Sequence, residues 1–149
     1  MSRQWPIGTV FTDVVLKDKN AVCPLCNSSM HVRAHREHKI YTLEKPVNLV
    51  CKQLHCSNEK CPNYDRLFNP AEEDNWTLPR WKIGWDVFTW IGFLRFKSHW
   101  SVPQIREVLK VGNRITLSDD AIEDYLKKYR LMVAARQQDL VRLKMEYKN

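Results

Sequence analysis

The 149-residue sequence predicts an α+β fold, in which a small β-rich domain is followed by a trihelical domain with a long C-terminal helix. Three observations support this prediction. Runs of β-forming residues and turn residues fill the first part of the chain, two short-spaced cysteine pairs occur in the same part, and apolar residues after Pro79 recur every three or four positions. We therefore expect a β domain over residues 1–70, a linker over 71–80 and a helical domain over 81–149.

Two strands joined by a turn are the main feature of the expected β domain. The runs 36–43 and 47–55 are rich in β-forming residues, and Glu44-Lys45-Pro46 between them suits a hairpin turn. The stretch TVFTDVVL near the N-terminus predicts a further strand. The segment AEEDNWTLPRW that follows the β domain is first acidic and then interrupted by proline, which is typical of a linker.

The first two helices are predicted from apolar spacing and capping residues. One amphipathic helix should run to about His99. The sequence Ser101-Val-Pro-Gln104 has the form of a capping box with proline in the first turn, so a second, short helix should begin at residue 102. We expect that helix to end at about Leu109, and Gly112 to take the left-handed conformation that often follows a helix end.

The third helix is predicted to begin after Ser118 and to continue almost to the C-terminus. Asp119 and Asp120 suit the positive end of its dipole. Its apolar residues alternate spacings of four and three, the rhythm of a coiled coil. They are Ile122, Leu126, Tyr129, Val133, Leu140, Leu143 and Tyr147, with Arg136 interrupting the series. This rhythm favours a homodimer through the C-terminal helix, and a tail that frays or packs within the chain is the alternative.

Two cysteine pairs form a candidate zinc site. Cys23-Pro-Leu-Cys26 supplies one pair and Cys56-Ser-Asn-Glu-Lys-Cys61 the other. Structural Zn²⁺ takes four tetrahedral ligands, and two short cysteine loops separated by a β-rich hairpin are typical of a zinc ribbon. The ion would supply folding energy rather than catalysis. Buried free thiols are the alternative, and a redox role is less favoured because no βαβ pattern surrounds the CPLC sequence.

Other potential ligands lie close to these pairs. Cys51 and His55 occur just before Cys56 in the strand VNLVCKQLHC, and either could replace one member of the set. Cys51 shares its strand parity with His55, so it can equally be an ordinary strand residue. We favour a basic, solvated face for the histidines of HVRAHREHK, which are His31, His35 and His38.

Composition and charge argue against several classes of protein. The five cysteines are an odd number and the N-terminus has no signal-peptide pattern, which disfavours a secreted disulfide framework. The most apolar stretch, IGWDVFTWIGFL, is too short to span a bilayer. We therefore expect a cytoplasmic protein without a membrane partner. The formal charge of +7 favours a polyanionic partner.

The helical domain is the candidate nucleic-acid interface. Three helices, with the second short and the third after a tight turn, match a helix-turn-helix in length and order. In that motif the start of the third helix enters the major groove, but here it is crowded with acids that repel phosphate. We therefore expect duplex DNA to be contacted by Arg106, Lys110, Asn113, Arg114, Thr116, Lys127, Lys128 and Arg130. A trihelical core whose charges are only solvated is the alternative.

Four stretches together resemble a known group of proteins. CPLC, HCSNEKCPNYDRLFNP, LPRWKIGWDVFTWIGFLRFKSHWSVPQIREVL and LSDDAIEDYLKKY are similar to the N-terminal zinc-ribbon and helix-turn-helix region of bacterial insertion-sequence transposases of the DDE type. The resemblance covers about residues 20–145 and is most specific over 78–129. It implies recognition of the ends of the mobile element, help in assembling the transposase, and association with the nucleoid in a bacterial cytoplasm.

No catalytic centre is expected in this chain. The DDE domain of such transposases follows the final helix, and it needs three carboxylates that hold two Mg²⁺ ions. Asp119, Asp120 and Asp124 cannot replace them, because they crowd the start of one helix. The chain is thus expected to be a fragment or a catalytically empty relative, with no small-molecule substrate.

Three functions remain open from the sequence. A DNA-binding module of a transposase-like protein is favoured. A standalone zinc-dependent transcriptional regulator, or a repurposed transposase-derived binding protein, is the first alternative. A zinc-ribbon adaptor that binds protein through its Trp-rich surface is the second.

Overall fold

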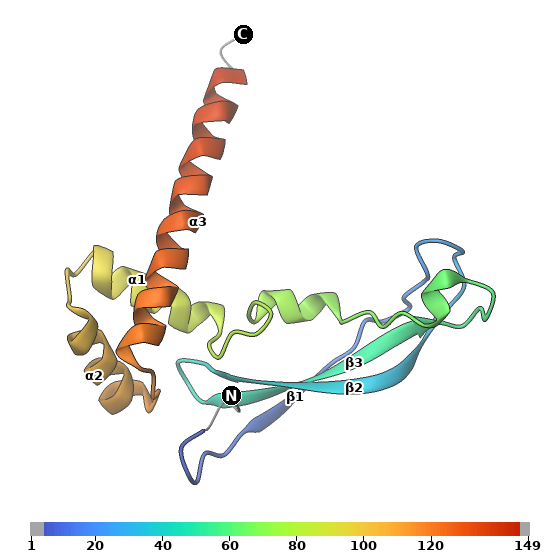
Figure 1. Cartoon of the computed structure of the whole chain (residues 1–149), viewed down its shortest axis with the longest axis horizontal. Helices are drawn as coiled ribbons and strands as arrows, with labels where there is room; N and C mark the ends of the chain where they lie inside the picture. Colours follow the sequence, from blue (N-terminus) through green and yellow to red (C-terminus); the bar gives the residue numbers. More distant parts are fainter. Residues whose placement is uncertain (1–4, 147–149) are drawn as a thin grey trace. The chain divides into compact units, whose positions relative to one another are not determined.

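The computed structural model describes residues 5–146 and shows a mixed α/β protein with a three-stranded sheet and three α-helices, of which the last is long (Figure 1). The chain divides into two compact units, Met1–Trp85 and Asp86–Asn149, called here the β unit and the helical unit. Within the described range, no helix combines the length and the apolar character needed to cross a bilayer.

The sheet consists of β1 (Thr12–Leu16), β2 (Met30–Tyr41) and β3 (Pro46–Cys56) in the order β1-β3-β2. The hairpin β2–β3 is antiparallel, as predicted, and the expected N-terminal strand is present. β1 pairs with β3 in parallel, however, which makes β3 the central strand. β2 begins six residues before the predicted start, because its polar first half still pairs with β3 through the backbone.

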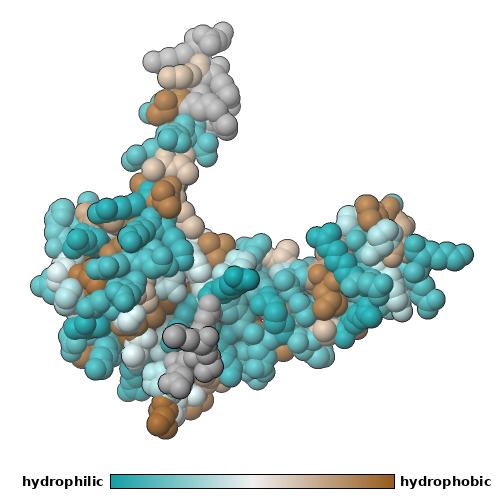
Figure 2. Space-filling model, in the orientation of Figure 1, coloured by the Kyte–Doolittle hydropathy of each residue, from teal (hydrophilic) through white to brown (hydrophobic). Residues whose placement is uncertain are grey.

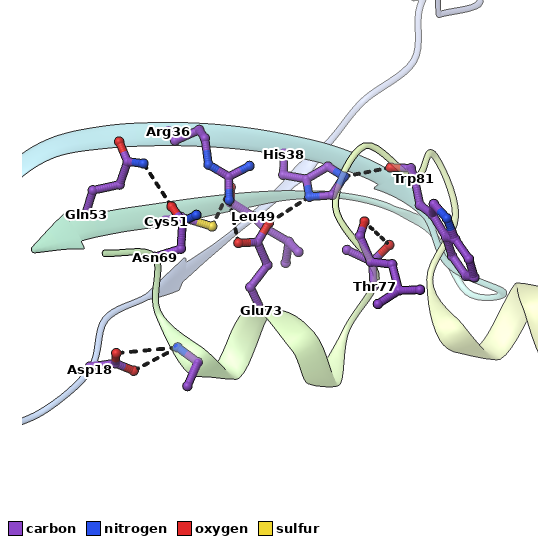
Figure 3. Close-up of polar contacts among 12 residues, drawn as sticks. Asp18, Arg36, His38, Leu49, Cys51, Gln53, Asn69, Glu73, Thr77 and Trp81 are labelled. Carbon is purple, nitrogen blue, oxygen red and sulfur yellow. Dashed lines mark hydrogen bonds and ion pairs between the residues drawn. The ribbon is translucent and has the colours of Figure 1, made fainter. Parts of the chain in front are cut away.

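Residues 71–80, expected to form a linker, instead pack within the β unit (Figure 3). They include the 3-10 helix η2 (Ala71–Asn75), whose Glu73 is buried against β2. One carboxylate oxygen of Glu73 accepts from Arg36 and the other from His38 Nδ1 at 2.8 Å. The sequence did not predict this contact, because the acidic run Glu72-Glu73-Asp74 suggested exposure to solvent.

His38 therefore differs from the solvated histidine that its sequence suggests. It is 6% exposed, whereas His31 and His35 are exposed as expected. Its second ring nitrogen lies 2.6 Å from the Trp81 carbonyl oxygen. One ring nitrogen thus lies within hydrogen-bond distance of the Glu73 carboxyl group and the other of a backbone carbonyl. The His38 ring thus joins η2, β2 and the Trp81 loop.

The segment after η2 continues this attachment to the sheet. Thr77 is buried and its hydroxyl donates to the Ile83 carbonyl at 2.7 Å. Ile83 forms a parallel bridge with Tyr41, whose N–H donates to the Lys82 carbonyl at 2.8 Å. The β unit consequently extends to Trp85, rather than ending near residue 70.

The helical unit contains α1 (Trp85–Phe96), α2 (Val102–Asn113) and α3 (Asp119–Glu146), with α1 beginning at the boundary between the units. The capping box at Ser101 and Gln104 is confirmed, since each side chain accepts from the other residue's backbone N–H. Ser118 precedes α3 and its hydroxyl accepts from the N–H of Ala121. The predicted starts of α2 and α3 are therefore correct.

The ends of α1 and α2 differ from the prediction. Gly112 does not end α2 in a left-handed conformation; the helix continues to Asn113, and Arg114 takes that conformation with φ 55°. His99 does the same after α1, with φ 58°. The backbone N–H of the next residue then donates six residues back, from Ile115 to Leu109 and from Trp100 to Leu94. This bond satisfies helix-end carbonyls and offsets the strain of a non-glycine residue at positive φ.

A close approach between α1 and α3 shapes the helical core. A Cβ atom at Gly92 would lie 2.3 Å from Tyr129 Cε2, so the two helices meet where α1 has no side chain. The Tyr129 ring lies 5.6 Å from the rings of both Phe88 and Phe96. The buried side chains around it include Ile91, Leu94, Ile105, Leu109, Ile115, Leu117, Ile122 and Leu126.

The second half of α3 extends away from this core (Figure 1). Every side chain from residue 131 to residue 141 is exposed, and apolar side chains are visible along this stretch (Figure 2). Val133 and Leu140 of the predicted seam are 39% and 50% exposed. Leu143 and Tyr147 lie outside the residues whose side chains are described. The alternative prediction, that the tail packs within the chain, is therefore wrong for residues 131–141.

Candidate metal centre and basic helical surface

The first cysteine loop is a tight turn between β1 and β2. Its ends are held by an antiparallel bridge between Val22 and Ser29, and the Asn27 N–H donates to the Cys23 carbonyl at 2.9 Å. Asn27 has φ 57°, a left-handed conformation that asparagine tolerates better than most residues. The turn brings the side chains of Cys23 and Cys26 to the same side.

The second cysteine loop leaves the end of β3 and closes on itself. The Cys61 N–H donates to the Asn58 carbonyl at 3.0 Å, and the 3-10 helix η1 (Pro62–Tyr64) follows directly. Met30, the first residue of β2, pairs with Cys56, the last of β3. Both loops are therefore placed at the same end of the hairpin, which is why residues thirty positions apart in sequence become neighbours.

The four sulfur atoms lie within 4.8 Å of one another. Cys23 Sγ is 3.7 Å from Cys61 Sγ, and Cys26 Sγ is 3.4 Å from Cys56 Sγ. Four sulfurs at the usual zinc–sulfur distance of about 2.3 Å form a tetrahedron with edges of about 3.8 Å. The cluster therefore has the size of a tetrahedral metal site, as the two sequence motifs predict.

Hydrogen bonds and burial act differently on the thiols. The hydroxyl and backbone N–H of Ser28 lower the pKa of Cys26 to about 6. Burial raises the pKa of Cys23, but the hydrogen bonds it accepts, foremost from Asn63, outweigh burial and lower it overall. Burial raises the pKa of Cys56 to about 12. Cys23, Cys56 and Cys61 are buried and Cys26 is exposed. A cation bound among the four sulfurs would offset the repulsion between thiolates placed this close together.

Neither alternative ligand belongs to the cluster. Cys51 is buried in the apolar centre of the sheet, and its thiol lies 3.8 Å from the Leu49 carbonyl. His55 Nδ1 lies 3.0 Å from the Tyr64 carbonyl oxygen, and the two rings meet edge to face. In the described part of the chain, the residues that bring metal-ligating atoms together are Cys23, Cys26, Cys56 and Cys61.

Two residues near the cysteines were not found from the sequence. Asn63 is 5% exposed and donates to Cys23 Sγ at 3.3 Å, and the backbone N–H of Asn58 donates to Cys56 Sγ at 3.4 Å. Such hydrogen bonds orient a metal-ligating thiolate and stabilise its charge. The available signal was position: both asparagines follow a cysteine by two residues.

The residues predicted to contact DNA fall into two groups on the helical unit. Arg106 donates to both carboxylate oxygens of Asp119 at 2.9 Å, and Lys128 pairs with Asp124 at 2.7 Å. The other group is formed by the exposed Lys110, Arg114, Thr116, Lys127 and Arg130, with Asn113 half-buried at the end of α2.

Comparison of the chain with protein-family models, with curated proteins and with solved structures finds no match of any of these kinds. The resemblance to transposase N-terminal regions therefore stays a prediction. Support for a function comes from the geometry of the chain's own residues.

Proposed function

We propose that this chain is the DNA-binding module of a transposase-like protein. In this proposal the helical unit binds duplex DNA, most simply at element ends, and the four cysteines hold a structural zinc ion in a ribbon. The proposal assigns the chain no catalytic step. The main support for the proposal is that α2, the turn 114–118 and α3 follow one another as in a helix-turn-helix, in a chain with a net positive charge.

The turn has the construction that a DNA-reading helix pair needs. Ile115 and Leu117 are buried and fix the angle between α2 and α3, while Arg114 and Thr116 between them stay exposed. In helix-turn-helix proteins, a fixed helix pair presents such polar residues to the major groove and its phosphates. Alternate burial along the turn thus supports helix-turn-helix geometry.

The acidic start of α3 is less of an obstacle than its sequence suggests. Asp119 is neutralised by Arg106 and Asp124 by Lys128. The acids at the start of α3 are Asp119, Asp120, Glu123 and Asp124, and the charge of two of them is thus partly offset by a neighbouring cation. The same ion pairs occupy Arg106 and Lys128, so these two cations are weaker candidates for DNA contact than Lys110 or Arg114.

The cysteine cluster suits a structural zinc ion better than a catalytic metal ion. Four thiolates close a tetrahedral coordination sphere, whereas catalytic zinc keeps one position open for water. Thiolate ligands also select zinc or iron–sulfur chemistry over magnesium or calcium. Metal analysis of the purified, reduced protein should find one equivalent of zinc, and less than about half an equivalent, with no other metal in its place, would contradict the assignment.

Duplex binding is tested by titrating the full chain against labelled random-sequence DNA. We expect binding that weakens as salt rises, because phosphate contacts release counterions. Arg114→Asn should weaken binding about tenfold, and asparagine preserves the left-handed conformation of this position. The matched variant Lys144→Gln, at an exposed position of α3 outside the apolar seam, should bind like the wild type. Absence of any duplex affinity at low salt would overturn the proposal.

Selection of bound sequences from random DNA separates the two DNA-binding functions. Enrichment of a sequence that matches terminal inverted repeats supports the transposase-like module. Enrichment of a sequence found only at promoters supports a standalone regulator instead.

We also propose a second copy of the chain as the partner of the exposed half of α3. Val133 and Leu140 share one face of the helix at heptad spacing and remain exposed. Leu140→Glu should shift the sedimentation of the chain from dimer toward monomer and leave its zinc content unchanged. A wild-type chain that sediments as a monomer at high concentration would exclude this pairing.

A further inference from the structure

A basic hollow of about 200 Å³ lies between the helices of the helical unit. It has an apolar floor and a charged rim. The lining residues are Arg95, Phe96, Val102, Glu123, Leu126, Lys127 and Arg130, which come from α1, α2 and α3. Lys127 and Arg130 were expected to contact DNA, whereas Arg95 was not singled out in the sequence.

Two of the three cations are held in place by the unit itself. Arg95 is half-buried and its Nη1 donates to the Trp100 carbonyl at 2.9 Å. The guanidinium of Arg130 lies over the Phe96 ring, 5.1 Å from its centre. Both groups keep further N–H donors for a ligand, since a guanidinium has five. Because their side chains are already ordered, binding costs less conformational entropy.

The charge of the hollow is not cancelled internally. Glu123 contributes one carboxylate against three cations, and none of the ion pairs among the described residues joins it to Arg95, Lys127 or Arg130. This contrasts with Arg106 and Lys128, which already face carboxylates. A net positive hollow with several N–H donors suits a single tetrahedral oxyanion.

We propose that this hollow seats one backbone phosphate of the bound duplex, an inference that rests on the proposed DNA-binding function. It places a phosphate contact on α1 and on the third and fourth turns of α3, beyond the acidic first turn. Arg95, Lys127 and Arg130 thereby fix the orientation of the helix pair on the DNA, whereas the exposed Arg114 and Thr116 contact base edges.

The test compares two double variants with equal charge change. Lys127→Gln with Arg130→Gln removes two cations from the hollow, and Lys17→Gln with Lys19→Gln removes two exposed cations from the β unit. The affinity of each for a short labelled duplex is measured over a series of salt concentrations. The hollow variant should bind at least tenfold more weakly, and the magnitude of its log–log salt slope should fall by about 0.9, as expected for the loss of one phosphate contact. The control should keep the wild-type slope.

A gain-of-function variant guards against loss through misfolding. Glu123→Gln removes the one negative charge of the hollow and should tighten duplex binding about threefold, as expected for a charge near a phosphate in a largely aqueous setting. Glu107→Gln makes the same change at an exposed site on α2 outside the hollow and should have no more than a minor effect.

The outcomes separate this inference from the proposed function. A wild-type chain with no duplex affinity at low salt defeats both. If the wild type binds but the two double variants lose affinity equally, or if Glu123→Gln binds no better than Glu107→Gln, duplex binding stands and the hollow is not a phosphate site.

Discussion

The β unit and the helical unit are held together by different kinds of contact. At the cysteine end of the β unit the buried cluster consists of Cys23, Cys56 and Cys61, with Met30 packed against it. The helical unit instead buries apolar side chains from all three helices. Apolar burial is present whatever the solution contains, whereas a sulfur cluster is cohesive only with a bound cation.

The β unit itself contains a second contrast. Its centre has an apolar cluster that includes Leu16, Ile40 and Leu49. Next to this cluster, Glu73 joins Arg36 and His38 in a buried polar network (Figure 3). The β unit thus combines an apolar cluster, a polar network and four clustered cysteines, and a single substitution can disrupt the network or the proposed metal site.

Loss of one of the four clustered cysteines, which we propose as zinc ligands, should have the largest effect on the stability of the β unit. Cys23→Ser removes one thiolate and with it most of the metal-coupled folding energy, which is on the order of 10 kcal/mol in small zinc domains. We expect zinc content below half an equivalent and fast amide exchange over both cysteine loops. The helical unit should keep its exchange protection, because its core contains no ligand.

Cys51→Ser is the matched control for that variant. Cys51 is as buried as Cys23 but lies outside the sulfur cluster. Its substitution should lower stability by an amount typical of a buried polar change and keep one equivalent of zinc. Equal zinc loss in both variants would show that the metal site is assigned to the wrong residues.

Neutralising Glu73 should have the next largest effect. Glu73→Gln leaves Arg36 and His38 without their charged partner, and because the Arg36 side chain is 36% exposed the cost should be below the about 3–5 kcal/mol of a fully buried pair. Burial raises the pKa of Glu73, but its hydrogen bonds to Arg36 and His38 outweigh burial and lower it below the ordinary 4.5. The charged network therefore contributes fully above about pH 4.5 and is lost as pH falls toward the lowered value.

The measurement for Glu73 is the free energy of unfolding against pH. Wild-type stability should decline below about pH 4.5, while Glu73→Gln should show a smaller decline over the same range. Cys51 also faces this carboxylate, and burial raises its pKa to about 11, so it stays protonated in acid. The exposed Glu72→Gln, with identical chemistry, should retain the wild-type profile. If the stability of Glu73→Gln declined with pH as steeply as that of the wild type, the network would not be the cause of the acid sensitivity.

A methyl group at Gly92 tests the apolar side of the comparison. Gly92→Ala places Cβ against the Tyr129 ring, which cannot easily move because Phe88 and Phe96 flank it. Overpacking of this kind costs about 1–3 kcal/mol. Gly112→Ala has nothing within 4 Å of the new atom and should stabilise α2 by about 0.5–1 kcal/mol. Thermal unfolding of both variants, followed by circular dichroism, should give shifts of opposite sign.

Local signals were sufficient for much of the molecule. The capping box at Ser101, the start of α3 after Ser118 and the four grouped cysteines follow from residue types at short spacing, and all three are present. Each depends on contacts within one turn or on a motif with a fixed metal geometry. Such short-range interactions can be predicted from residue types and their spacing in the sequence.

Contacts between residues far apart in the sequence could not be predicted from such local signals. The parallel pairing of β1 with β3 joins segments about 35 residues apart, and nothing in TVFTDVVL states its partner. Glu73 resembled a solvated acid until its partners on β2 were known. Arg114 and His99 replaced glycine at helix ends, because the six-residue backbone bond that follows offsets their strain.

The smallest predicted effects distinguish a helix cap from a surface ion pair at the start of α3. Asp119 lies at the positive end of the helix dipole, as expected, and pairs with Arg106, whereas Ser118 supplies the cap. Ser118→Ala should therefore cost about 1 kcal/mol. Asp119→Asn loses only a solvent-exposed pair and should cost less than about 1 kcal/mol, with a further decrease in high salt. Chemical denaturation at two salt concentrations measures both, and a larger loss for Asp119→Asn than for Ser118→Ala would reassign the cap.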